Sequence, residues 1–346
     1  MLKRISSLFY MVMLAPFVIA TPNITKVTPT ASFNDGEIVT VTGTGFGTKA
    51  NSKPLLWWRA DMGKNPSPLG RKHAWDGIFL GEASSTIVAP NSSQAYRHDL
   101  GIDSAGSLAV VFFNSDELYM FRKTYEDFDI TKDHKNGTFN FKTLRLWSWA
   151  DKNNAFLNAQ GVEGPSFRLS NEYTDNTFWA TGHNQKPYIW KREELVYRTS
   201  GINVKDGIFD YYVDGNLPYS ETFINRDSSR PSKFDRLYQQ QVSNGAQPNS
   251  WVYYDSLYVD DSWHRIILCS SSTWNSCSDM EVQIPTAWGN NTISFVINYG
   301  GLTTSHNIYL YIVDGNNVAN NIGYNISTPN ATNPPLPPIL NVTPNN

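Results

Sequence analysis

The alternation of apolar and polar residues along the chain predicts β-strands almost throughout. Residues 107–114 (SLAVVFFN) form a nearly continuous apolar run, which is typical of a strand buried on both faces. Residues 208–213 and 219–224 predict a hairpin across the turn Asp214-Gly215-Asn216. Short segments like these are separated by Gly, Asn, Asp and Pro turns, without a convincing helical period. The pattern indicates an all-β sandwich or jelly roll.

The predicted strand at residues 138–149 is the main candidate for function. Successive side chains of a regular strand point to opposite faces, so we expect Lys142 and Arg145 to face opposite ways. One face would carry Phe139, Phe141, Thr143, Arg145, Trp147 and Trp149, and the other Asn140, Lys142, Leu144, Leu146 and Ser148.

Residues 35–49 (DGEIVTVTGTGFGTK) predict a strand that runs into a bend made by three glycines. A nucleotide-binding loop would need GxGxxG spacing and a following helix, and the sequence has neither. The stretch resembles the opening of an IPT/TIG domain, a small immunoglobulin-like sandwich whose second strand ends in a GxGFG-type turn. Residues 265–326 resemble the second half of such a domain, in order and in length. This resemblance implies one sandwich that is interrupted by an insertion.

A second resemblance covers residues 190–261. The segments WKREELVYRTSG, DGIFDYYVDG and VYYDSLYVDD look like the later strands of concanavalin A-like lectin/glucanase jelly rolls. That group includes laminin-G-like binding modules, glycoside hydrolases and several polysaccharide lyases. The two resemblances imply an all-β fold in which a concanavalin A-like jelly roll is inserted into an Ig-like (IPT/TIG) β-sandwich. The expected parts are a signal peptide (1–20), the first part of the Ig-like domain (23–54), the jelly roll (55–263), the second part of the Ig-like domain (264–326) and a Pro/Asn-rich tail (327–346).

The N-terminal residues predict export. Lys3 and Arg4 precede an apolar run at 8–19, and Val18-Ile19-Ala20 forms a small-residue cleavage site. We therefore expect a secreted or cell-surface protein, and a periplasmic location fits as well. The apolar run is too short to span a bilayer, so we expect no membrane insertion of the mature chain.

Charge and composition narrow the class of partner. The formal net charge is −3 and basic clusters are absent from the sequence, which argues against a nucleic-acid partner. Aromatic residues make up 14% of the chain, including 11 Trp and 18 Tyr. Aromatic faces stack on sugar rings as well as filling β-sandwich cores. These features favour a polysaccharide or cell-surface glycan as the partner.

The cysteine pair and three aspartates are the candidates for structural chemistry. Cys269 and Cys277 are the two cysteines, and in an exported protein they predict a disulfide that closes a short loop. Two cysteines with one nearby histidine fall short of a zinc site, and no cofactor is expected. Calcium is the one ion with candidate ligands, Asp255, Asp260 and Asp261, although paired aspartates at a strand end more often cap a turn.

The resemblance to concanavalin-like jelly rolls gives the strand at 138–149 a functional interpretation. If Leu144 and Leu146 face the core, Arg145, Trp147 and Trp149 line the opposite face, which in that fold is the concave groove where glycans lie. Arg can pair with a uronate carboxylate and Trp can stack on a sugar ring. The alternative is that the aromatic residues fill a core, with Arg145 at its rim.

Three functions follow as hypotheses. The preferred one is a secreted carbohydrate-binding or adhesive protein that presents its jelly roll to a polysaccharide. The alternative is a lyase that cleaves a uronate glycan by β-elimination, with Arg145 or Lys142 neutralising the carboxylate and His183 or Tyr253 as base or acid. The third is a non-catalytic structural surface module. A glycoside hydrolase is disfavoured because the adjacent Glu193 and Glu194 point to opposite faces of a strand.

Overall fold

The three-dimensional description rests on a computed structural model. It describes residues 21–64, 67–72, 74–76, 81–101, 108–130, 132–133, 140–160, 166–171, 176–180, 187–239, 243–302 and 307–327. The expected signal peptide and, apart from Ser327, the expected tail lie outside these residues. The described residues contain no helix that is long and apolar enough to cross a membrane.

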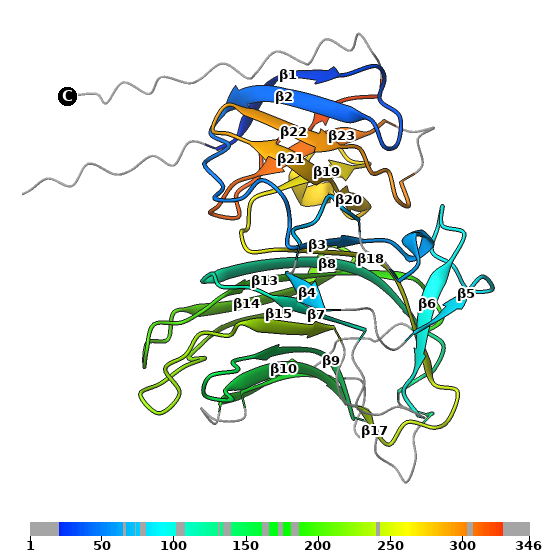
Figure 1. Cartoon of the computed structure of the whole chain (residues 1–346), viewed down its shortest axis with the longest axis vertical. Coiled ribbons are helices and arrows are strands. Elements are labelled where there is room, and N and C mark those ends of the chain that lie inside the picture. Colours follow the sequence, from blue (N-terminus) through cyan, green and yellow to red (C-terminus); the bar gives the residue numbers. More distant parts are fainter. Residues whose placement is uncertain are drawn as a thin grey trace, which may run out of the picture.

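The fold is all-β, as the sequence predicts, and strands from both ends of the chain form two four-stranded antiparallel sheets. In the first sheet β2 lies between β1 and β22, and Val41 is paired with Ile293. The chain thus returns to this sandwich after a long excursion (Figure 1). Its assignment as an IPT/TIG domain stays a prediction. The sheet orders are β1 (Asn23–Pro29), β2 (Ile38–Thr44), β22 (Thr292–Val296), β21 (Ile284–Trp288), and β20 (Met280–Val282), β19 (Arg265–Cys269), β23 (Tyr309–Val313), β24 (Tyr324–Asn325).

The middle of the chain forms two eight-stranded sheets, which we call the β8 sheet and the β9 sheet. The β8 sheet has the order β15 (Asn216–Phe223), β14 (Gly207–Val213), β13 (Lys191–Arg198), β8 (Glu117–Glu126), β18 (Trp251–Asp260), β6 (Ala95–Asp99), β5 (Glu82–Ser84), with β3 (Leu56–Trp58) paired to β18. The β9 sheet has the order β12 (Asn176–Ala180), β11 (Ser166–Asn171), β10 (Asn154–Gln160), β9 (Asn140–Trp147), β16 (Arg236–Gln239), β7 (Ala109–Phe112), β4 (Trp75–Asp76), with β17 (Ser243–Asn244) paired to β9.

The predicted hairpin shows how local sequence sets this topology. Strands β14 and β15 pair antiparallel, and the chain reverses between them at Asp214 and Gly215. Both residues have positive φ, 51° and 76°, which is the backbone that a tight two-residue turn requires. Asp and Gly adopt that backbone more easily than most residues, so the turn signal in the sequence is confirmed.

The main core lies between the β8 and β9 sheets. Leu118, Met120 and Leu195 from the β8 sheet share one buried cluster with Leu144 and Leu157 from the β9 sheet. In Figure 1 strands β8, β9 and β10 curve in the same sense, with β9 and β10 on the inside of the bend. The face that the β9 sheet turns away from the core is therefore concave, and we call it the concave face.

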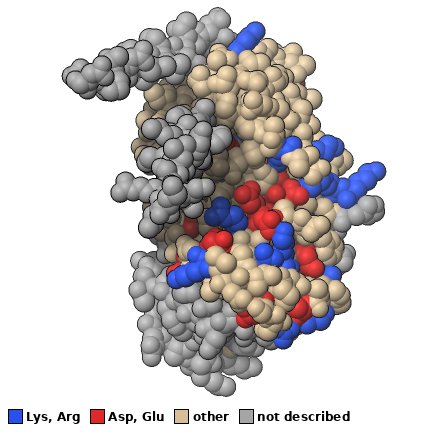
Figure 2. Space-filling model, turned by 90° about the vertical axis from the view of Figure 1, so that its left-hand side faces the viewer, with Lys and Arg blue, Asp and Glu red and all other residues tan. Residues whose placement is uncertain are grey.

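The other face of the β8 sheet is covered by the terminal sandwich. Tyr119, Phe121 and Val196 pack there in one buried cluster with Ile267 and Val282 of the sandwich. The Trp263 indole also donates to the backbone oxygen of Tyr197 at 2.9 Å. Figure 2 shows charged side chains of both signs gathered over the middle of the molecule, below an upper part with mostly uncharged surface. The terminal sandwich thus contacts the β8 sheet on the side opposite the β9 sheet and its concave face.

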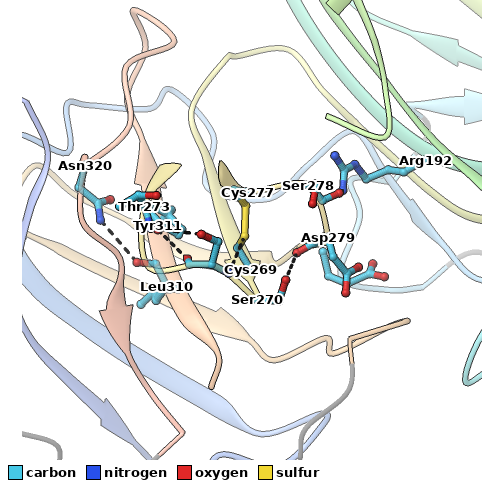
Figure 3. Close-up of a disulfide and its surroundings, with 12 residues drawn as sticks. Arg192, Cys269, Ser270, Thr273, Cys277, Ser278, Asp279, Leu310, Tyr311 and Asn320 are labelled. Carbon is cyan, nitrogen blue, oxygen red and sulfur yellow. Dashed lines mark hydrogen bonds between the residues drawn. A yellow bond between two sulfur atoms is a disulfide. The ribbon is translucent and has the colours of Figure 1, made fainter. Parts of the chain in front are cut away.

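The predicted disulfide is confirmed. Cys269 and Cys277 are bonded, with their Cα atoms 5.9 Å apart. Figure 3 shows that Arg192 of β13 reaches toward the loop that this bond closes. The Arg192 Nη1 donates to the Ser278 backbone oxygen at 2.7 Å. The disulfide therefore shapes a loop that also contacts the β8 sheet.

Candidate active site

A bulge in β9 decides which side chains reach the concave face. Leu157 of β10 is paired with Leu144, and the next residue, Asn158, is paired with Lys142. Thr143 is thus the extra residue of a β-bulge, which shifts the alternation of side chains along the strand.

Both cations of β9 lie on the concave face because of this bulge. The Lys142 Nζ is 4.3 Å from the ring centroid of Phe156, and the Arg145 guanidinium carbon is 6.0 Å from the same centroid. Our expectation that Lys142 and Arg145 face opposite ways is therefore wrong, because the strand is not regular. Phe141 and Thr143 also leave the face that we predicted for them, and Phe141 packs in the main core.

Arg145 is held in a defined orientation. Its Nε and Nη2 donate to the Oδ1 of Asn154, at 3.1 and 2.9 Å, and Asn154 is fully buried. Its guanidinium carbon lies 4.3 Å from the centroid of the Trp147 ring. A guanidinium that is stacked and hydrogen-bonded in this way loses little further freedom when it pairs with a carboxylate.

Tyr238 lies directly across from Arg145. The two residues are paired in the antiparallel register of β16 and β9. Directly opposite side chains have Cβ atoms about 4.5–5.5 Å apart, so the phenol and the guanidinium are neighbours. Tyr238 is half-buried, whereas Leu237 and Gln239 on either side are fully buried on the core side. The concave face thus combines a positive charge with an adjacent acid-base group.

Trp149 extends this face beyond the end of β9. It is 55% exposed, with the guanidinium carbon of Arg236 at 4.3 Å and the Lys152 Nζ at 3.7 Å from its ring centroid. Its backbone N–H donates to the Asp235 carboxylate at 3.3 Å. The structure therefore brings Arg145, Trp147 and Trp149 to one side of the sheet, and their role in glycan binding stays a prediction.

The two other residues named for acid-base chemistry do not join this group. His183 lies outside the described residues. Tyr253 lies on the outer face of the β8 sheet, where its ring is 5.6 Å from that of Tyr125, while the next residue, Tyr254, packs in the core. Burial raises the pKa of Tyr253. The pairing of Tyr253 with Arg145 is wrong, because the strand period directs Tyr253 away from the concave face.

The calcium candidates are each engaged with other partners. Asp260 is buried and forms an ion pair with Lys49, and Asp261 pairs with Arg71. Asp255 accepts from the backbone N–H of Ala60 at 3.3 Å. Burial raises the pKa of Asp260 to about 6, against the opposing effect of Lys49. In the part of the chain that the structure describes, no group of three His, Cys, Asp or Glu residues could hold a metal ion, and calcium binding by these aspartates stays a prediction.

Sequence reasoning missed Tyr238 and the position of Lys142. The segment RLYQ at 236–239 is too short to stand out as a strand, although Arg236 and Tyr238 alternate with Leu237 and Gln239. That alternation is the signal that could have placed Tyr238 on a polar face.

No protein-family pattern matches this sequence. No curated protein matches it either. Solved structures do match part of the chain. The alginate lyase Aly36B, in complex with alginate tetrasaccharide, has a TM-score of 0.38 and 11% identity, and it covers 54% of this chain and 96% of its own. The endo-β-1,4-glucuronan lyase of the fungus Trichoderma reesei has a TM-score of 0.38 and 12% identity, covering 60% of this chain and 95% of its own. The marine PL-14 alginate lyase of Aplysia kurodai has a TM-score of 0.37 and 12% identity, covering 54% and 89%.

These comparisons correct one expectation. Our preferred hypothesis was a non-catalytic carbohydrate-binding or adhesive protein, and the matching structures are polysaccharide lyases. The preferred hypothesis is therefore wrong, and the lyase alternative is the one we develop. At these identities and TM-scores we transfer no residue role from any of these proteins.

Proposed function

We propose that this protein is a polysaccharide lyase that cleaves a uronate-containing glycan by β-elimination. The observation that carries the proposal is the concave face of the β9 sheet. There the bulge at Thr143 places Lys142 beside Arg145, and the register places Tyr238 directly opposite Arg145. The predicted export would bring the protein to extracellular polysaccharides.

The reaction needs charge neutralisation first. Removing the proton at C5 of a uronate places negative charge on the adjacent carboxylate, and fixed cations stabilise that charge best when they are oriented beforehand. Arg145 meets this requirement through its bonds to Asn154 and its stacking on Trp147. Lys142 adds a second cation beside the same Phe156 ring.

Tyr238 supplies the proton transfer. Its phenolic oxygen, in the deprotonated form, would accept the C5 proton. The electrons of the C5–H bond form the C4=C5 double bond, and the C4–O bond to the leaving sugar breaks. The same phenol can then return its proton to the leaving oxygen, so no water and no redox cofactor are consumed.

The aromatic residues provide the binding surface. Trp149 is exposed beside Arg236 and Lys152, so it offers aromatic surface for a sugar ring next to two cations. Alternating cationic and aromatic groups match the carboxylates and the rings of a polyuronate chain. A neutral glucan offers these cations no carboxylate.

The test is incubation of the purified protein with alginate, with glucuronan and with a neutral glucan, following the ultraviolet absorbance of the unsaturated product. We expect absorbance to rise with a polyuronate only. Tyr238→Phe should lower kcat by roughly 10²–10⁴-fold, the usual contribution of general acid-base catalysis, with the oligosaccharide affinity and the melting temperature retained. Absence of product from every polyuronate, or full activity in Tyr238→Phe, would refute the proposal.

A further inference from the structure

Arg122 of β8 is a fully charged side chain inside the main core. It is 2% exposed and lies on the side of β8 that faces the β9 sheet. Burial is the largest single effect and lowers the pKa of this guanidinium, but the Glu193 carboxylate on β13 together with Tyr211 and Tyr254 outweighs it and raises the pKa. The Arg122 Nε donates to the Glu193 Oε2 at 2.6 Å. The pair is thus ionised inside the sandwich, on the strands that also carry the buried Lys191–Glu126 pair.

The guanidinium reaches across the core to the bulge. Its Nη1 donates to the Thr143 backbone oxygen at 2.9 Å, and its Nη2 donates to the Thr143 Oγ1. Thr143 is the residue without a partner of its own in β10. Arg122 therefore gives a donor both to the Thr143 carbonyl oxygen, a backbone acceptor at the bulge, and to the buried Thr143 hydroxyl.

The same guanidinium also contacts β16. The Arg122 Nη1 donates to the Gln239 Oε1 at 2.9 Å, and the Gln239 amide lies 3.0 Å from the Met120 sulfur. Gln239 directly follows Tyr238, whose side chain points to the opposite face of the same strand. One planar group thus bonds to both strands that carry the proposed catalytic residues.

Stability is a weak explanation for such a pair. A buried ion pair costs several kcal/mol of desolvation per ion, and apolar residues of similar volume are often as stabilising. The arrangement is better explained by geometry, because the fork of a guanidinium fixes several acceptors at once and an ammonium cannot.

We propose that Arg122 is a positioning residue for the candidate active site. By clamping Thr143 and Gln239 from the core side, it maintains the bulge that puts Lys142 and Arg145 on one face and sets the register of Tyr238 beside them. The inference rests on the proposed lyase function for its catalytic consequence. Its structural consequence, that Arg122 maintains the bulge, does not depend on that function.

The test compares two double variants. Arg122→Met with Glu193→Gln removes both charges, so that neither is left buried alone. The matched control is Lys191→Met with Glu126→Gln, a second buried ion pair between the same strands β13 and β8. Among the described contacts, the charged groups of this control pair bond to each other and to neither β9 nor β16. Both variants should melt at reduced temperatures, the Arg122 variant at the lower one because Thr143 and Gln239 also lose a donor.

Measurements of kcat and crystal structures then distinguish the Arg122 double variant from the control double variant. Because a misplacement of about 1 Å can cost 10²-fold, we expect the Arg122 double variant to lose roughly 10²-fold in kcat on a polyuronate, and the control to stay near wild type. Arg122→Lys keeps the charge but lacks the fork, so it should retain stability better than activity. Crystal structures of the folded variants should show Lys142 or Arg145 displaced from the Phe156 ring only in the Arg122 double variant.

Two results would overturn the inference. One is a normal kcat in the Arg122 double variant, and the other is an unchanged bulge with Lys142 and Arg145 still beside Phe156. If the wild-type protein cleaves no polyuronate, the lyase proposal fails. The clamp is then judged on the crystal structures alone, where a retained bulge refutes it and a lost bulge supports it.

Discussion

Replacement of Arg145 by alanine tests the candidate site most directly. The change removes the proposed carboxylate partner, the two hydrogen bonds to the Asn154 Oδ1 and the stacking on Trp147. A matched control is Lys205→Ala, which removes an exposed cation from the loop before β14 near Glu221 of the other sheet.

The expected magnitudes differ for binding and for stability. A hydrogen bond to a charged group contributes about 1.5–3 kcal/mol, which corresponds to roughly 10–150-fold in affinity. For stability, the buried Asn154 oxygen loses the hydrogen bonds from Arg145. The cost is about 1–2 kcal/mol, because Arg145 is only half-buried and water can take over part of the space and the bonding of its side chain. That loss lowers the melting temperature of a domain of this size by roughly 2–8 °C.

The assay is calorimetric titration with a uronate oligosaccharide in the Tyr238→Phe background, so that no substrate is turned over. Thermal unfolding of the same samples measures stability. We expect at least a tenfold loss of affinity with a small drop in melting temperature, and neither change in the Lys205 control. Unchanged affinity would show that Arg145 does not pair with the substrate. A drop in melting temperature far above that range would show that Arg145 is mainly structural.

Two further predictions concern the terminal sandwich. The Cys269–Cys277 bond spans a sequence separation of 8, and the loss of so short a loop closure in Cys269→Ser with Cys277→Ser should cost about 2–3 kcal/mol. Amide exchange should rise in β19 more than in β9, and equal protection with and without the bond would contradict this. Burial, with a smaller effect of Lys49, lowers the pKa of His264 to about 4, so its neutral form is favoured in the folded state. Its contribution to stability is present above about pH 6.5 and is lost as the pH falls toward 4. Urea unfolding between pH 7 and 4 should therefore depend less on pH in His264→Gln, and identical profiles would show that His264 does not titrate as expected.

The period-two patterns and turn signals were enough to predict the all-β fold. They depend on local chemistry, since β-branched and aromatic residues favour strands and the Asp214-Gly215 turn needs positive φ at both residues. The disulfide could also be predicted from the sequence, because the chain has two cysteines at a short separation and an expected export signal.

The side of the sheet to which each side chain points was harder to predict from the sequence. Tyr253 was named as an acid-base candidate without a way to know which side of β18 meets the core, and packing directs it away from Arg145. Tyr238 was overlooked because β16 is four residues long, and its importance comes from lying beside β9.

The sequence by itself therefore determined the strands, the hairpin, the disulfide and the aromatic and cationic character of residues 138–149. Only the tertiary structure decided that Lys142, Arg145 and Tyr238 share one face. The physical reason is the bulge at Thr143, because one extra residue reverses the alternation of side chains along the rest of the strand. Its polar groups are bonded by Arg122, which is 21 residues away in the chain and on the opposite sheet. A contact of that kind leaves no signal in the residues on either side of the bulge.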